Sequence, residues 1–133
     1  MSMDRRVGPG FDANGNLPSG VHRMSLKSVA RRFGWNAERR RLLSGLARAV
    51  SSLAAAGVKR VWVDGSFVTD TEEPNDIDGC WEYDPSVDVD KLDEVFLDLH
   101  PPREAMMRKY GVVFLISGTR LTNGALIELG EEA

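Results

Sequence analysis

Two aspartates and a Gly-Ser pair are the residues whose types and spacing point most directly to chemistry. Asp76 and Asp78 lie two positions apart, and alternate residues of a strand project from the same face. The two Cα atoms of such a pair are roughly 6.5–7 Å apart, so the carboxylates repel one another unless a cation lies between them. Magnesium prefers oxygen ligands of this kind. The pair therefore predicts a site for Mg²⁺ or Mn²⁺.

The Gly-Ser pair, Gly65 and Ser66, directly follows a predicted strand. A glycine lets the backbone approach a phosphate closely, and Ser66 offers a hydroxyl and an N–H donor. Phe67 comes next and is placed to stack on a nucleobase, although packing in the core is the commoner role of aromatic residues. With Asp76 and Asp78, this turn would grip a metal-chelated triphosphate and leave its α-phosphorus open to in-line attack.

One helix and two strands must position these residues. Asn36 is a good N-cap and Gly57 a good stop, and the apolar residues between them recur at helical spacing. Residues 58–64 and 76–83 are rich in strand-forming types and predict neighbouring strands of one sheet, against which the helix packs. Three arginines at positions 39–41 lie in the first turns of this helix. They are expected to face largely outward, as a solvated basic face or a phosphate contact.

The rest of the chain supplies further helices and strands. Helical spacing predicts helices over 25–33, 88–99 and 103–109, and apolar runs predict a buried central strand over 111–117 and a last strand over 125–129. This order predicts an α/β (α+β) fold with a mixed sheet and helices packed against it. Residues 1–24 are rich in Gly, Asn and Pro and predict an extended N-terminal arm. Residues 25–133 then form a single domain.

The composition is that of an ordinary globular domain, with 42% hydrophobic and 28% charged residues among 133. No apolar run approaches the roughly 18 residues that cross a bilayer, and the N-terminus lacks the apolar core of a signal peptide. Cys80 is the single cysteine, which excludes an internal disulfide framework and suits a reducing compartment. We therefore expect a cytoplasmic protein without a membrane partner.

Charge is distributed unevenly along the chain. Residues 1–63 contain 12 Lys and Arg against three acids, whereas residues 64–133 contain five against 17, for a net charge of −3. This asymmetry indicates a polar partner or an acidic metal site, or else basic and acidic surfaces that mix in three dimensions. The overall acidity argues against a general nucleic-acid binder.

The run Gly65-Ser-Phe-Val-Thr-Asp-Thr-Glu-Glu-Pro-Asn-Asp-Ile-Asp78 resembles the signature of the DNA polymerase β nucleotidyltransferase superfamily. That signature is a Gly-Ser or Gly-Gly pair followed by an Asp-x-Asp with hydrophobic flanks. A longer stretch, from Phe11-Asp-Ala-Asn-Gly-Asn-Leu-Pro to Val61-Trp-Val-Asp-Gly-Ser-Phe-Val-Thr-Asp, resembles small stand-alone bacterial proteins of this fold.

The resemblance implies that Gly65 and Ser66 hold the β- and γ-phosphates and that Asp76 and Asp78 ligate magnesium. Superfamily members usually carry a third carboxylate on a later strand, where it serves the attacking hydroxyl. The corresponding segment, 112–117, contains no acid, and Glu128 is the nearest substitute in pattern. Glu128 can reach the site only if the last strand lies beside the Asp-x-Asp strand. Asp64 flanks the turn and is placed to tune the site.

Two hypotheses follow from the resemblance. In the first, the chain transfers a nucleoside monophosphate from a Mg-bound nucleoside triphosphate to a hydroxyl of a protein, a nucleic-acid end or a small molecule. Such small proteins often belong to toxin–antitoxin or defence pairs, and a partner protein or a second copy would present the acceptor. In the second, the domain lacks the third carboxylate and only binds a nucleotide or a partner protein.

Overall fold

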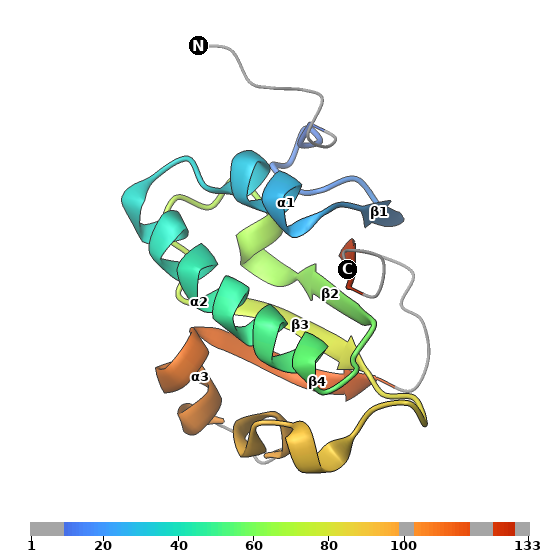
Figure 1. The fold of residues 1–133 in the computed structure, drawn as a ribbon. Coiled ribbons are helices and arrows are strands. Elements are labelled where there is room, and N and C mark those ends of the chain that lie inside the picture. The colour runs from blue at the N-terminus through green and yellow to red at the C-terminus, as the bar shows by residue number, and fades with distance from the viewer. Residues whose placement is uncertain (1–9, 99–102, 118–123, 130–133) are drawn as a thin grey trace.

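The computed structural model describes residues 10–98, 103–117 and 124–129 (Figure 1). Its elements are three α-helices, three short 3₁₀ turns and five strands within this part of the chain. In chain order they are β1 (Val21–Arg23), α1 (Leu26–Phe33), α2 (Ala37–Ala55), β2 (Arg60–Asp64), η2 (Gly65–Val68), β3 (Ile77–Glu82), η3 (Val89–Lys91), η4 (Glu94–Leu97), α3 (Glu104–Tyr110), β4 (Val112–Ser117) and β5 (Gly124–Glu128).

All five strands form one mixed sheet in the order β1-β5-β2-β3-β4. The central strand β2 is antiparallel to both of its neighbours, β3 and β5. The two outer pairs, β1 with β5 and β3 with β4, are parallel. The predicted α+β class, with helices packed against a mixed sheet, is therefore confirmed, and the two strands predicted to be neighbours are neighbours.

Helix α2 lies across the sheet and begins and ends as the sequence predicts (Figure 1). The side chain of Asn36 accepts a hydrogen bond from the backbone N–H of Arg39, which satisfies one of the free donors of the first turn. Ser25 caps α1 in the same way through Ser28. The apolar side of α2 packs on side chains from one face of the sheet, and these residues share one buried core with α1 and α3.

The opposite face of the sheet carries a second, smaller buried cluster. It consists of Trp62, Cys80 and Leu126, which are cross-strand neighbours on β2, β3 and β5. Burial raises the pKa of the Cys80 thiol to about 11, so the thiol is protonated at neutral pH. Cys80 therefore has a packing role, and the nearby carboxylates further disfavour its thiolate.

Three expectations from the sequence are wrong. Residues 10–24 are not a separate arm, because Val21–Arg23 forms an edge strand and the preceding turn pairs with Thr69; residues 1–9 lie outside the described part. Within 88–98 the chain forms two short 3₁₀ turns instead of a helix, and each is capped by an aspartate; residue 99 lies outside the described part. Strand β4 lies at the edge of the described sheet and is not central.

None of the helices in the described part of the chain is both long enough and apolar enough to cross a membrane.

Candidate functional site

Three carboxylates gather where β2 ends and β3 begins. In the antiparallel register Asp64 lies directly opposite Asp78, and cross-strand partners of this kind have Cα atoms about 4.5–5.5 Å apart. Asp76 immediately precedes β3, two residues from Asp78. The core residues of these strands alternate with Asp64 and Asp78, so both carboxylates lie on the sheet face that does not contact α2.

The electrostatics of this cluster are unfavourable without a cation. Burial raises the pKa of Asp64 and of Asp76, and burial followed by the charges of Asp76 and Asp64 raises the pKa of Asp78. None of the hydrogen bonds or ion pairs among the described residues compensates these three carboxylates. The raised pKa of Asp78 indicates that this group lies close enough to Asp76 and Asp64 to be affected by their charges.

Gly65 is required at the turn by both its conformation and its surroundings. Its φ of 74° lies in the left-handed region that side chains disfavour. A Cβ placed on it would lie 2.5 Å from Oδ2 of Asp78. The sequence predicts that this glycine makes room for a phosphate, and in the structure the space of its absent side chain is taken by the Asp78 carboxylate. The glycine therefore lets the acidic group pack directly against the turn.

Of the two residues that follow Gly65, Phe67 is placed differently from its prediction. Ser66 is half-buried, and its carbonyl accepts hydrogen bonds from the backbone N–H and the hydroxyl of Thr69. Phe67 is fully buried against Phe33 in the core, so its predicted stacking on a nucleobase is wrong. The first residue of the turn stays at the surface, and the chain then enters the core within two residues.

Arg39 is also placed differently from the prediction of an outward face. It is fully buried, and its guanidinium donates five hydrogen bonds to the backbone carbonyls of Phe33, Phe67, Thr69 and Thr71. Burial lowers its pKa to about 10, so it stays charged at neutral pH. With every donor occupied, Arg39 braces the turn from inside and cannot bind a phosphate.

Glu128 does not join the carboxylate cluster. Strand β5 pairs with β2 and not with β3, and Glu128 lies opposite Arg60 at the far end of β2 from Asp64. Positions 60 and 64 are four residue steps apart along the strand, which is about 13 Å. The Glu128 carboxylate forms ion pairs with Arg60 at 3.6 Å and Arg23 at 3.8 Å. Its predicted catalytic place is therefore wrong, and the ion pairs give it a structural role.

The third carboxylate at this end of the sheet is that of Asp64. The signal that could have found it is strand pairing: in two neighbouring antiparallel strands, the last residue of the first strand, Asp64, lies opposite Asp78 at the start of the second. Asp64 was predicted only to tune the site. In the structure it is a full member of the cluster.

The residues present fit a divalent cation held together with a phosphate ligand. Within the described ranges, no three His, Cys, Asp or Glu side chains converge into a ready-made cage. Magnesium, however, is usually held by one or two carboxylates plus phosphate oxygens of its substrate. Asp76 and Asp78 supply two hard oxygen donors, and their charges have no other compensation among the described contacts. These two residues would hold the ion, and Asp64 lies beside them.

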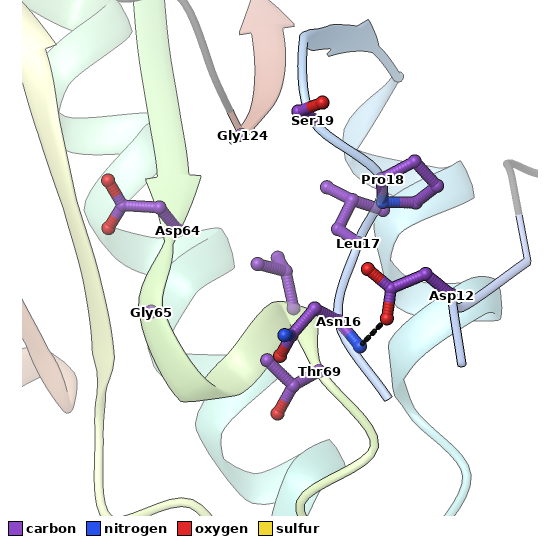
Figure 2. Close-up of a pocket in the computed structure, with 10 residues that line it drawn as sticks. Asp12, Asn16, Leu17, Pro18, Ser19, Asp64, Gly65, Thr69 and Gly124 are labelled. Atoms are coloured by element: carbon purple, nitrogen blue, oxygen red, sulfur yellow. Dashed lines mark hydrogen bonds between the residues drawn. The ribbon is translucent and has the colours of Figure 1, made fainter. Parts of the chain in front are cut away.

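A pocket of about 410 Å³ opens beside the cluster (Figure 2). The backbone of Asp64 and Gly65 forms one wall, and the N-terminal segment 16–19 forms the wall across from it. Asp76, Asp78 and Ser66 do not line it, so only Asp64 and Gly65 belong to both the pocket and the turn. The described lining residues are Asp12, Asn16, Leu17, Pro18, Ser19, Asp64, Gly65, Val68, Thr69 and Gly124.

Fold and site thus define an α+β domain with three carboxylates and a side pocket at one end of its sheet. Residues 9–124 match the model of a family of unknown function, DUF6932, and the chain belongs to that family. The matched range includes the three aspartates and every described lining residue of the pocket, and it ends before Glu128. No curated protein and no solved structure shows significant similarity.

The raised pKa values predict that neutralising Asp78 stabilises the fold. A carboxyl whose pKa is higher in the folded state costs stability as pH rises from its unfolded value, near 4, through the folded value. Asp78→Asn should therefore raise the free energy of unfolding at pH 7 by about 0.5–1 kcal/mol, and the gain should shrink toward pH 4. Urea denaturation at several pH values measures this. The exposed Glu94→Gln is the control, and a pH-independent difference for Asp78→Asn would contradict the account.

Proposed function

We propose that this protein is a metal-dependent nucleotidyltransferase of the cytoplasm, which uses Mg²⁺ or Mn²⁺ to transfer a nucleoside monophosphate from a triphosphate to a hydroxyl. The observation that carries the proposal is the placement of Asp64, Asp76 and Asp78 at one end of the sheet beside the glycine turn, with no compensating cation among the described contacts. The resemblance of the turn and the Asp-x-Asp run to the polymerase β superfamily supports the same activity.

Each residue has a distinct part in this proposal. Asp76 and Asp78 hold the cation, which when bound would neutralise phosphate charge and polarise the α-phosphate. Gly65 keeps the turn free of a side chain, so that the Asp78 carboxylate packs against it. Arg39 fixes the segment after the turn through its carbonyl contacts. Positioning of this kind is the main source of rate in phosphoryl transfer.

Asp64 is the group proposed to take the proton from the acceptor hydroxyl. Its raised pKa makes it a better base than an exposed aspartate. The acceptor oxygen forms a bond to the α-phosphorus, the bond from that phosphorus to the bridging oxygen breaks, and pyrophosphate leaves with the bond's electron pair. The hydroxyl proton goes to Asp64.

Transfer of label from [α-³²P]ATP or [α-³²P]GTP to the components of a cell extract tests this assignment. With Mg²⁺ present, the wild-type protein should label an acceptor. Asp64→Asn should lower the rate by about 10²–10³-fold, while nucleotide binding is retained. Glu128→Gln is the matched control and should transfer normally, because Glu128 lies at the other end of β2. Binding without transfer in the wild type would favour the binding-only domain.

A further inference from the structure

Helices α1 and α2 carry an exposed basic face. They lie next to each other on one side of the sheet and contribute to one buried core (Figure 1). Together they contain seven Lys and Arg residues and one acid, Glu38. Arg32 and Arg39 are buried. The other five are exposed and make up the basic face: Lys27, Arg31, Arg40, Arg41 and Arg48.

Most of the positive charge on the basic face has no acidic partner. Arg40 donates to the backbone carbonyl of Gly34 at 3.2 Å. Arg48 donates to that of Lys109 at 2.9 Å. A neutral carbonyl does not compensate the charge of a guanidinium. Of the five residues, only Arg41 forms an ion pair within the described ranges, with the acid of its own helix.

The carboxylate cluster lies on the other side of the sheet, away from α2. Glu72 reaches the start of α2, where it accepts a hydrogen bond from Trp35 and interacts with the buried Arg39. A helix is about 10–12 Å across, which exceeds the Debye length of about 8 Å at physiological salt. The net charge of −3 argues against a general nucleic-acid binder, but at short range the acids of the sheet do not cancel the field of the basic face.

The surface between the basic residues fits a phosphate backbone better than a protein. The exposed residues of α2 in this surface are small: Ser44, Ala47, Ser51, Ala54 and Ala55. All the exposed large hydrophobic residues of the described part lie outside α1 and α2, so the face lacks the apolar anchors that dominate protein interfaces. It also lacks exposed aromatic rings, on which the bases of a single strand would stack. Arginine, in contrast, binds phosphate in a bidentate geometry.

We propose that the basic face binds the phosphate backbone of a nucleic-acid duplex. Arg40 and Arg48 are eight positions apart on α2, which is about 12 Å, whereas the phosphates of one strand recur about every 3.4 Å along the duplex axis. The helix can therefore contact several phosphates. Contacts of this kind position a duplex without reading its base sequence. The inference goes beyond the proposed function and does not rest on it, because it uses neither the carboxylate cluster nor a nucleotide.

Fluorescence anisotropy with a labelled DNA duplex and a labelled RNA duplex tests the proposal. The titrations contain EDTA and no nucleotide, so that no metal ion bridges the duplex to the carboxylates. If three to four phosphates are neutralised, the logarithm of the binding constant should fall against the logarithm of the salt concentration with a slope of about −3. Affinity then falls roughly 50-fold between about 50 and 200 mM salt. A single strand of equal length should bind more weakly.

Arg40→Met removes one charge from the basic face and should weaken duplex binding about tenfold at low salt and reduce the salt slope by about one. Lys91→Met removes the same charge from the exposed η3 and should bind like the wild type. Glu38→Gln releases Arg41 from its ion pair and should tighten binding. Urea denaturation of each variant confirms that the fold is retained.

Three results would overturn the inference: no binding of either duplex, equal binding by the wild type and Arg40→Met, or tighter binding of the single strand than of the duplex. Labelled poly-glutamate is titrated in parallel. Tighter binding of this peptide than of the duplex would also overturn the inference, by assigning the basic face to an acidic protein. None of these outcomes bears on metal-nucleotide binding, so failure here is distinguishable from failure of the proposed function.

Discussion

Replacing Arg39 by methionine is expected to lower the free energy of unfolding by about 3–5 kcal/mol. The side chain is fully buried and its five donors satisfy four backbone carbonyls, so its loss leaves these acceptors buried without partners. The guanidinium also lies 3.7 Å from the ring centroid of Trp35 and 4.9 Å from that of Phe67, and these cation–π contacts would be lost as well.

Arg40→Met is the matched control for this prediction. Arg40 follows Arg39 on the same helix but is exposed, and its side chain makes one described hydrogen bond, at 3.2 Å to the carbonyl of Gly34. The change should cost no more than about 0.5 kcal/mol. Urea denaturation compares the two variants. Equal stability of Arg39→Met and Arg40→Met would refute the bracing role of Arg39.

Local signals in the sequence were sufficient for the helices and for most strands. The side-chain caps at Ser25 and Asn36 and the left-handed Gly57 set the bounds of α1 and α2, because each acts on the backbone next to it. The 88–98 segment shows the limit of such signals. Its apolar residues have helical spacing, but Asp88 and Asp93 each cap a separate short turn, and these local hydrogen bonds compete with a continuous helix.

The positions of Arg39 and Phe67 could not be read from local pattern. Arginines in the first turns of an amphipathic helix are usually solvated, and a tertiary contact reverses this expectation for Arg39. The segment from Phe67 to Thr71 passes over the start of α2 and presents its carbonyls to that side chain. The same crossing buries Phe67 beside Phe33. Neither the burial of Arg39 nor that of Phe67 can be predicted from the few residues on either side of it in the sequence.

The order of the strands in the sheet determines which residue supplies the third carboxylate. The alternation of side chains along a strand predicts that Glu128 shares a face of the sheet with Leu126. It does not predict which strand β5 pairs with. Because β5 pairs with β2, Glu128 meets Arg60, and the carboxylate beside Asp78 comes from the end of β2 itself. The Asp-x-Asp pair and the glycine turn were found from sequence because their geometry is local.

Loss of metal-nucleotide binding on neutralising Asp78 is the second large expected effect. The charges of Asp76 and Asp64 both disfavour the ionised form of Asp78, and the Asp78 carboxylate packs against Gly65. A bound cation would relieve this repulsion. Asp78→Asn should therefore stabilise the free protein and weaken its binding of the metal nucleotide. Such opposition between stability and binding is expected of a functional site and not of a surface acid.

Calorimetric titration with Mg-ATP and Mg-GTP tests the central claim most directly. The wild-type protein should bind at least one of the two only when the divalent cation is present. Asp78→Asn and Asp76→Ala should each weaken that binding at least about tenfold, equivalent to 1.4 kcal/mol. Glu128→Gln should titrate like the wild type. Equal titrations for the wild type and Asp78→Asn, or no heat with either nucleotide, would contradict a metal-nucleotide site at this end of the sheet.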